Sequence, residues 1–238
     1  MASIFTKAFH RLHRELPTQR KLEELNWGQI FDSATHDSEW LVKRAFNPGR
    51  WAMGFPGLYI LFRTLSETRP KHILEFGLGE SSKLTHQYRS YYPDTGLTII
   101  EQDSEWKEVF CQTVFDVSDA VRILPLKITG KGRSKHYSYQ DLMPAINGKK
   151  YDFIIVDGPW GSRRNSRNQI LDIIREGLLA DEFIILVDDA NRRGEADTIR
   201  QIQKLLKSQN KGYAKGFYRG RKDSCVICSS GYRFLTSL

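Results

Sequence analysis

Short apolar runs alternate with longer helix-like stretches along most of this chain, from residue 72 onward. The apolar runs are rich in β-branched residues and predict strands at 72–76, 97–101, 121–125, 151–156 and 183–188. The stretches between them predict helices near 81–91, 104–115, 138–146, 166–178 and 194–208. Strands that alternate with helices in this way indicate an α/β fold, with a mostly parallel sheet covered on both faces.

The two ends of the chain depart from this alternation. Residues 212–219 and 224–235 predict two strands around the turn Gly220-Arg-Lys-Asp223, and these would close the sheet with an antiparallel C-terminal hairpin. The N-terminal part predicts helices instead, with one at 58–65 that leads into the first strand. Apolar residues at helical spacing also occur at Phe5, Phe9, Leu12, Leu16, Trp40, Leu41 and Ala45. We therefore expect a helical N-terminal extension over residues 1–70 and an α/β domain over residues 71–238.

A glycine turn joins the first predicted strand to the helix that follows it. The sequence there is Glu75-Phe-Gly77-Leu-Gly79-Glu80-Ser81. Glycine lets the backbone turn tightly and approach a ligand closely, while the free N–H groups of the helix start face that ligand. A dinucleotide-binding turn would carry a third glycine where this chain has Ser82. The turn therefore predicts a nucleotide-like cofactor and argues against a dehydrogenase.

An acidic residue ends the second predicted strand. Glu101 lies 22 residues beyond Gly79. A carboxylate at this place can accept hydrogen bonds from both ribose hydroxyls of a bound nucleoside. The alternative is a solvated carboxylate at the end of a strand.

The glycine turn resembles the first motif of class I S-adenosylmethionine-dependent methyltransferases, which reads acid-x-Gly-x-Gly-x-Gly, with Ser81 in place of the last glycine. The resemblance implies a Rossmann-like methyltransferase fold with a seven-stranded sheet whose seventh strand is inserted beside the sixth. It implies S-adenosylmethionine as the cofactor. The residues that it assigns to cofactor binding are Glu75, Gly77, Gly79, Ser81, Ser82 and Glu101.

Acidic residues follow two further predicted strands. Asp157 comes directly after strand 151–156, and Asp188 and Asp189 lie at the end of strand 183–188. Because ligands bind at the carboxyl ends of parallel strands, these carboxylates should converge beside the cofactor. Such a concentration of negative charge requires compensation. Either cations from nearby loops neutralise it, or a divalent metal such as Mg²⁺, Mn²⁺ or Ca²⁺ does.

This arrangement resembles the metal-dependent O-methyltransferases of the catechol and caffeoyl-CoA type, which carry Asp after strand four and Asp-Asn after strand five. Asp157 and Asp188 match those positions, and Asp189 replaces the Asn. It also resembles the glycan O-methyltransferases that include the plant glucuronoxylan enzymes. There, strand four ends in a turn like Val156-Asp157-Gly158-Pro159, followed by a basic loop like Gly161-Ser-Arg163-Arg164. The resemblance covers about residues 72–230 and implies methyl transfer to a hydroxyl oxygen.

Methyl transfer to oxygen assigns a role to the three aspartates. A sugar or phenol hydroxyl is a weak nucleophile until it loses its proton. A metal held by Asp157, Asp188 and Asp189 would lower the hydroxyl pKa, or one of these carboxylates could act directly as the general base. The non-catalytic alternative is that Asp188 or Asp189 caps the helix near Gly194, or pairs with Arg192 or Arg193.

The charge of the chain bears on the acceptor. The net charge is +8, and from Asn191 to the end there are eleven lysines and arginines against three acids. Further basic clusters occur at Lys127, Lys131, Arg133 and Lys135 and at Arg163, Arg164 and Arg167. Arginine suits carboxylate and phosphate, so the sequence favours an anionic carbohydrate or small-molecule acceptor, bound by Arg163 and Arg164. For most of the lysines the alternative is a solvated surface.

Two other functions stay open from the sequence. Asp157-Gly-Pro-Trp160 stands where nucleic-acid amino-methyltransferases carry Asp-Pro-Pro-Trp or Tyr, and the basic charge would suit RNA or DNA phosphates. Against this, Gly158 replaces the first proline. The other possibility is a non-catalytic, cofactor-binding interaction protein, because the side chain of Ser81 could crowd the donor.

Length and composition are those of a globular protein. The chain has 238 residues, of which 40% are hydrophobic and 27% charged. Its longest apolar stretch, 55–62, is too short to span a bilayer, and no apolar segment follows the basic N-terminus, so we expect a cytoplasmic protein without a membrane partner. Three cysteines make no disulfide framework, and Cys225-Val-Ile-Cys228 predicts strand packing better than a metal site.

Overall fold

A computed structural model describes residues 17–49, 51–146 and 148–237. Its main feature is a seven-stranded sheet in the order β3-β2-β1-β6-β7-β9-β8. The strands are β1 (His72–Phe76), β2 (Gly96–Glu101), β3 (Val121–Ile123), β6 (Tyr151–Val156), β7 (Leu179–Val187), β8 (Ala214–Tyr218) and β9 (Ser224–Cys228). All neighbouring pairs from β3 to β7 are parallel, whereas β9 is antiparallel to both β7 and β8. The α/β fold, the mostly parallel sheet and the C-terminal hairpin are thus confirmed.

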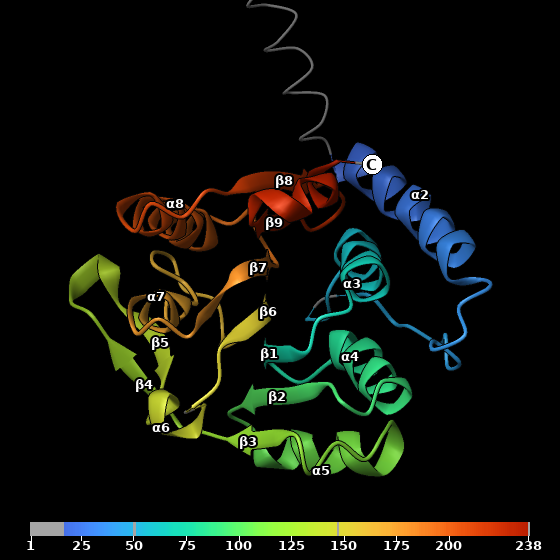
Figure 1. The fold of residues 1–238 in the computed structure, drawn as a ribbon, viewed down its shortest axis with the longest axis horizontal. Coiled ribbons are helices and arrows are strands. Elements are labelled where there is room, and N and C mark those ends of the chain that lie inside the picture. The colour runs from blue at the N-terminus through green and yellow to red at the C-terminus, as the bar shows by residue number, and fades with distance from the viewer. Residues whose placement is uncertain (1–16, 50, 147, 238) are drawn as a thin grey trace, which may run out of the picture.

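Helices cover both faces of this sheet (Figure 1). One face carries α3 (Phe55–Thr68), α4 (Glu80–Tyr91) and α5 (Ser104–Thr113). The other carries α6 (Leu142–Ala145), α7 (Ile170–Arg175) and α8 (Arg193–Ser208), together with a small hairpin of β4 (Leu126–Thr129) and β5 (His136–Tyr139). α2 (Pro17–Thr35) packs on the outer side of α3.

Alternation along the strands produces two hydrophobic cores, one on each face. Ile73 of β1 belongs to the core under α3 and α4, and its neighbour Leu74 belongs to the core under α7 and α8. Phe153 and Ile154 of β6 divide in the same way. Because successive strand residues point to opposite faces, a continuous apolar run supplies both cores. This is why the buried strands are mainly apolar on both faces.

The cysteines of β9 follow the same rule. Cys225 is buried in one core and Cys228 in the other, and neither forms a disulfide. Their side chains cannot meet at one metal ion. The expectation of strand packing for this pair is confirmed.

Three of the elements predicted from the sequence differ from the structure. The predicted helix 138–146 begins instead as strand β5, where the buried Ser138 and Tyr139 pair with β4, and only α6 is helical. The predicted strand 224–235 ends at Cys228 and continues as a 3₁₀ segment, Ser230–Thr236. Residues near Trp40 form no helix, since Gln87 of α4 accepts the backbone N–H groups of Val42 and Lys43.

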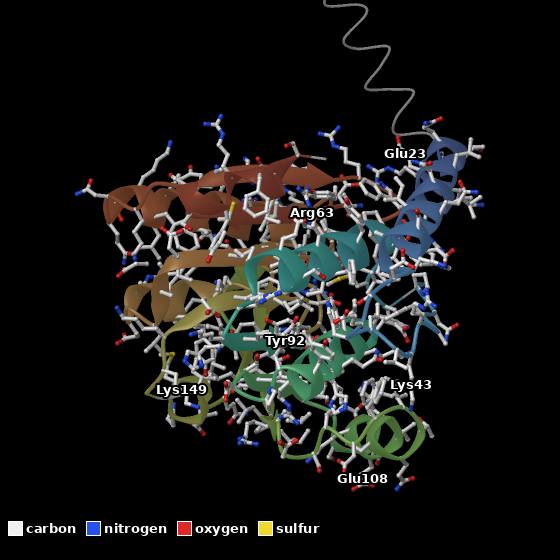
Figure 2. The ribbon with its side chains drawn as sticks, turned by 45° about the vertical axis from the view of Figure 1, so that its right-hand side comes forward. Glu23, Lys43, Arg63, Tyr92, Glu108 and Lys149 are labelled. Atoms are coloured by element: carbon white, nitrogen blue, oxygen red, sulfur yellow. The ribbon has the colours of Figure 1, made fainter. Side chains whose placement is uncertain are left out.

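The N-terminal helices share a core with the sheet. Trp27 and Phe31 of α2 are buried in the same cluster as Leu58 of α3 and Ile73 of β1. In Figure 2, Arg63 of α3 lies beside the C-terminal strands, where it donates a hydrogen bond to the carbonyl of Ser237. The predicted helical positions Phe5, Phe9, Leu12 and Leu16 lie outside the described residues. No helix in the described part of the chain is long and apolar enough to cross a membrane.

Candidate active site

A pocket of about 250 Å³ opens at the carboxyl ends of β1, β2 and β6. Its wall comes from the glycine turn after β1, the segment after β2 and the segment after β6, with additions from α5 and the loop before α3. The lining residues are Trp51, Ala52, Gly77, Leu78, Gly79, Glu80, Glu101, Gln102, Asp103, Trp106, Asp157, Gly158, Pro159, Trp160, Gly161, Arg167, Asp189 and Arg192. This is the place where an open α/β sheet binds its ligand.

Gly77 shapes the turn that closes one side of the pocket. Its φ is +93°, a backbone conformation that residues with a Cβ rarely adopt. A Cβ placed there would also lie 3.4 Å from the carbonyl carbon of Asp157 and from the nitrogen of Gly158. That distance is ordinary van der Waals contact, so the positive φ is what favours glycine at this position.

Glu75 holds the turn from below. It is fully buried, and its carboxylate accepts hydrogen bonds from the hydroxyls of Ser81 (2.5 Å), Ser82 (2.9 Å) and Thr85 (2.7 Å) at the start of α4. Burial raises the pKa of Glu75 to about 7, and the three hydroxyl hydrogen bonds oppose that rise. Of the residues predicted to bind the cofactor, Glu75, Ser81 and Ser82 thus lie beneath the pocket, whereas Gly77, Gly79 and Glu101 line it.

Glu101 is fixed by backbone N–H groups from two segments. One carboxylate oxygen accepts from Leu78 at 2.8 Å, and the other accepts from Gln102 at 2.7 Å and Asp103 at 3.0 Å. Burial raises the pKa of Glu101, and these hydrogen bonds oppose the rise. A carboxylate has about four acceptor positions, so Glu101 retains capacity toward a ligand in the pocket.

Trp106 of α5 completes this side of the pocket. Its indole N–H donates to the carbonyl of Leu78 at 2.8 Å, so that Glu101 and Trp106 hold the two backbone groups of Leu78. The side chain remains partly exposed at the pocket. Sequence reasoning did not single out Trp106. Its position three residues after the N-cap Asp103 of the helix that follows Glu101 was the available signal.

The three aspartates meet on the opposite side, as the sequence predicted. One carboxylate oxygen from each of Asp157, Asp188 and Asp189 lies within 4.8 Å of the others. Asp157 and Asp189 line the pocket, whereas Asp188 lies behind it and accepts a hydrogen bond from the Ser224 hydroxyl at 2.9 Å. Convergence follows from the parallel register of β6 and β7, which pairs Val156 with Val187.

Cations from two separate loops compensate this cluster. Arg167 is buried, with guanidinium nitrogens 3.2 Å from Asp157 Oδ1 and 3.2 Å from Asp189 Oδ2. Lys222, in the turn between β8 and β9, places its Nζ 3.6 Å from Asp188 Oδ2 and 3.5 Å from Asp189 Oδ1. Sequence reasoning placed Arg167 in a basic cluster but assigned it no role. Lys222 was counted only within the net charge.

Burial controls the protonation of the cluster. Desolvation, followed by the charge of Asp188, raises the pKa of Asp157 well above its ordinary value, and Arg167 opposes this rise. Desolvation and then the charge of Asp189 raise the pKa of Asp188. The Oδ1 atom of Asp157 and the Oδ2 atom of Asp188 accept no hydrogen bond from the described residues. Asp157 thus lies at the pocket wall with a raised proton affinity, and its Oδ1 atom is buried against Arg167.

The structure agrees in part with the non-catalytic alternative, in which Asp188 or Asp189 caps a helix or pairs with an arginine. Asp189 pairs with Arg192 at 3.0 Å, as that alternative supposed. Neither Asp188 nor Asp189 caps α8, however, because the N-cap residue of this helix is Arg192, and it makes no side-chain capping bond. The ion pair leaves Asp189 at the pocket wall.

A second pocket of about 570 Å³ adjoins the first. The two share Trp51, Trp160, Gly161 and Arg192. The second pocket adds Tyr137, Ser162, Arg163, Arg193 and Gly194. The rings of Tyr137 and Trp160 meet edge to face at 5.5 Å between their centroids. Three arginines and several aromatic rings therefore surround a space beside the first pocket.

The two arginines predicted to bind the acceptor separate in the structure. Arg163 is exposed and lines the second pocket. Arg164 lines neither pocket and pairs instead with Asp197 of α8. Adjacent residues in a loop point in different directions, which a sequence motif does not reveal.

Comparisons with known proteins identify the fold. No family model and no curated protein matches the chain. Among solved structures, TomG, the O-methyltransferase of Streptomyces achromogenes involved in tomaymycin synthesis, solved with S-adenosylmethionine, matches 87% of this chain and 99% of its own at 16% identity, with a TM-score of 0.54. A protein of Staphylococcus aureus assigned as a caffeoyl-CoA O-methyltransferase matches 86% of this chain and 100% of its own at 18% identity, with a TM-score of 0.53. The chain therefore has the Rossmann-like fold of these methyltransferases.

Proposed function

We propose that this protein is an S-adenosylmethionine-dependent O-methyltransferase that modifies a hydroxyl of an anionic acceptor. One observation carries the proposal: a pocket lined by Gly77, Gly79 and Glu101 adjoins an arginine-lined pocket, and Asp157 lies in the wall of the first. A donor and an acceptor can thus occupy adjacent spaces beside a carboxylate. The solved O-methyltransferases of the same fold support this assignment.

The first pocket fits the donor on chemical grounds. The N-terminus of α4 follows Gly79 at the pocket, and the partial positive charge of a helix N-terminus suits the carboxylate of a methionine moiety. Glu101 retains acceptor capacity for the ribose hydroxyls. The exposed face of Trp106 offers an apolar surface to the adenine ring.

Ser81 does not obstruct this pocket. Its hydroxyl donates to Glu75 and it lines no part of the wall. The reason for suspecting a non-catalytic cofactor-binding protein was crowding of the donor by this side chain. That reason is absent, so we favour catalysis.

Asp157 is the residue that we assign as general base. S-adenosylmethionine, when bound, supplies a methyl group on a positively charged sulfur, with S-adenosylhomocysteine as the leaving group. Asp157 takes the proton of the acceptor hydroxyl as the new oxygen–carbon bond forms and the carbon–sulfur bond breaks. Its raised pKa makes it a stronger base than an ordinary carboxylate. Arg167 holds the carboxylate in place through its contact with Oδ1.

The second pocket fits the acceptor. Arg163, Arg192 and Arg193 favour a carboxylate, sulfate or phosphate on it. Tyr137 and Trp160 supply flat apolar surfaces for the remainder of a sugar or an aromatic ring. A uronate-bearing carbohydrate combines these features. We include no metal step, because the acidic cluster already contacts Arg167 and Lys222.

Nucleic-acid amino-methylation is the second candidate function. Trp160 is more than half exposed at the mouth of the site and could stack a base, and the basic residues of the β4–β5 hairpin are exposed. Phosphate-driven binding weakens steeply with salt, whereas binding of a small acceptor through two or three arginines responds less. A salt titration of acceptor binding therefore separates the two candidates.

The proposal is tested by thermal denaturation with S-adenosylmethionine, S-adenosylhomocysteine and NAD in parallel. A ligand at about a hundred times its Kd adds roughly 2.7 kcal/mol of stability. We expect both sulfur ligands to raise the Tm and NAD to leave it unchanged. Transfer of labelled methyl groups to uronate, neutral and oligonucleotide acceptors then distinguishes the acceptor classes. A Tm shift with NAD alone would refute the proposed function.

A further inference from the structure

The acidic cluster has a donor set that, taken alone, suits a divalent cation. Asp157, Asp188 and Asp189 offer oxygens within 4.8 Å of one another. Asp157 Oδ1 and Asp188 Oδ2 accept no hydrogen bond within the described chain. Hard cations such as Mg²⁺ and Mn²⁺ take carboxylate ligands of this kind. The carboxylates by themselves therefore do not exclude a metal.

The same oxygens already face positive charges of the chain. Arg167 Nη1 lies 3.2 Å from Oδ1 of Asp157, and Lys222 Nζ lies 3.6 Å from Oδ2 of Asp188. Asp189 contacts both cations, Arg167 through one oxygen and Lys222 through the other. Each of the three carboxylates thus has a cationic partner.

Arg167 is held in this position by further contacts. Its Nε donates to the carbonyl of Pro159 at 3.1 Å, and its Nη1 donates to the carbonyl of Asp188 at 3.4 Å. A fourth buried acid, Glu195 of α8, lies behind it at 3.9 Å. If the guanidinium moved away, it would leave buried acids without a partner, and such a change is strongly unfavourable.

We propose that Arg167 and Lys222 occupy the place of a divalent metal in this cluster, so that the cluster works without a metal ion. A divalent cation bound to the same carboxylates would lie close to Arg167 and Lys222, and both side chains would repel it. In our interpretation Arg167 and Lys222 are positioning residues, which orient Asp157 and Asp189 at the pocket wall. A bound divalent ion would otherwise be needed to neutralise these carboxylates.

The proposal goes beyond the proposed function and can be tested without any donor or acceptor. Mn²⁺ binding to the chelator-treated full chain is measured by electron paramagnetic resonance and calorimetry. We expect the wild-type chain to show no Mn²⁺ binding in the micromolar range. The Lys222→Met variant should gain Mn²⁺ affinity by about tenfold or more, because the carboxylates remain and one repelling charge is lost. The double variant Arg167→Met with Lys222→Met should gain more.

Two controls make the result specific. Lys215→Met removes the same charge from an exposed position on β8 and should leave Mn²⁺ binding as in wild type. Lys222→Arg keeps the charge and should also behave as wild type. Circular dichroism verifies that each variant is folded, and Lys222→Met alone suffices if the double variant does not fold.

Two results would overturn the proposal. The first is a wild-type chain that binds one Mn²⁺ at micromolar concentration and loses it in Asp188→Asn. The second is a folded Lys222→Met variant with no gain in Mn²⁺ affinity, since the cations would then not be what excludes the metal. Neither result depends on methyl transfer, so the proposed function stands or falls separately.

Discussion

Gly77 and Asp157 lie side by side after β1 and β6, where the backbone N–H of Asp157 donates to the carbonyl of Phe76, the residue before Gly77, at 3.1 Å. This contact joins the turn that we assign to the donor with the residue that we assign as the base. It arises because β1 and β6 are adjacent parallel strands that end at the same level, with Phe76 paired to Val156. The spacing between donor and base is therefore set by the sheet.

Substitution of Gly77 tests the role of this turn. Gly77→Ala places a side chain at φ +93°, and we expect a loss of about 1–3 kcal/mol in the free energy of unfolding. Binding of S-adenosylhomocysteine should also weaken, because the turn must shift. The control is Gly132→Ala, which has φ +56° but meets nothing within 4 Å and lies in the β4–β5 hairpin. Equal donor affinity in the two variants would contradict the assignment of the turn.

Glu75 should make stability depend on pH. Its folded-state pKa is about 7 against an ordinary value of 4.5, so the folded chain holds a proton that the unfolded chain releases between these values. The contribution of Glu75 is fully present below about pH 4.5 and is lost as pH rises to about 7, a difference of about 3 kcal/mol. Urea unfolding from pH 5 to pH 8 should therefore show a flatter pH dependence for Glu75→Gln than for wild type.

The exposed Glu108, labelled in Figure 2, supplies the control for this measurement. Glu108→Gln should leave the pH dependence of unfolding unchanged. An identical pH dependence in wild type and Glu75→Gln would show that the buried carboxyl is not protonated in the folded chain.

The contrast between Arg163 and Arg164 tests the acceptor pocket. Arg163→Ala should raise the KM for an anionic acceptor by about tenfold, which corresponds to the loss of about 1.4 kcal/mol of binding. Arg164→Ala should leave that KM nearly unchanged, because this side chain pairs with Asp197 outside both pockets. Steady-state kinetics at saturating donor measure both. Equal effects of the two substitutions would remove the basis for the acceptor assignment.

Asp157→Asn tests the general base. We expect kcat to fall by roughly 10²- to 10⁴-fold, with donor affinity almost unchanged. In wild type the rate should rise with pH as the Asp157 carboxyl, whose pKa is raised, loses its proton. This rise should be absent in Asp157→Asn. The exposed Asp181→Asn serves as the control, and a variant of Asp157 with wild-type kcat would exclude it as the base.

The sheet was predictable from the sequence because its buried strands are mainly apolar and alternate with helix-like segments. Residues 72–76 and 151–156 are mainly apolar, and both are observed as strands with those bounds. The β4–β5 hairpin was missed because 138–146 contains residues compatible with a helix, and because its pairing with residues 126–129 is a tertiary effect. Gly130 and Gly132, with φ of +85° and +56°, were the local sign of the hairpin turn.

In the candidate site, the residues that follow strands were predictable from the sequence, whereas the cations that contact them were not. The glycine turn, Glu101 and the aspartates follow strands directly, so their convergence is a consequence of topology. Arg167 reaches the cluster from the segment between β6 and α7, whereas Lys222 reaches it from the distant turn between β8 and β9, and no local pattern links either side chain to it. The need to neutralise three carboxylates predicted either such cations or a divalent metal, and the sequence did not decide between them.

Donor binding is the most direct test of the central claim, and titration calorimetry with S-adenosylhomocysteine measures it. We expect one binding site in wild type, a loss of about tenfold or more in affinity for Glu101→Gln, and no change for the exposed Glu105→Gln on α5. The same titration with NAD should show no heat of binding. Wild-type affinity for S-adenosylhomocysteine in Glu101→Gln, or binding of NAD in place of the sulfur ligand, would contradict the account.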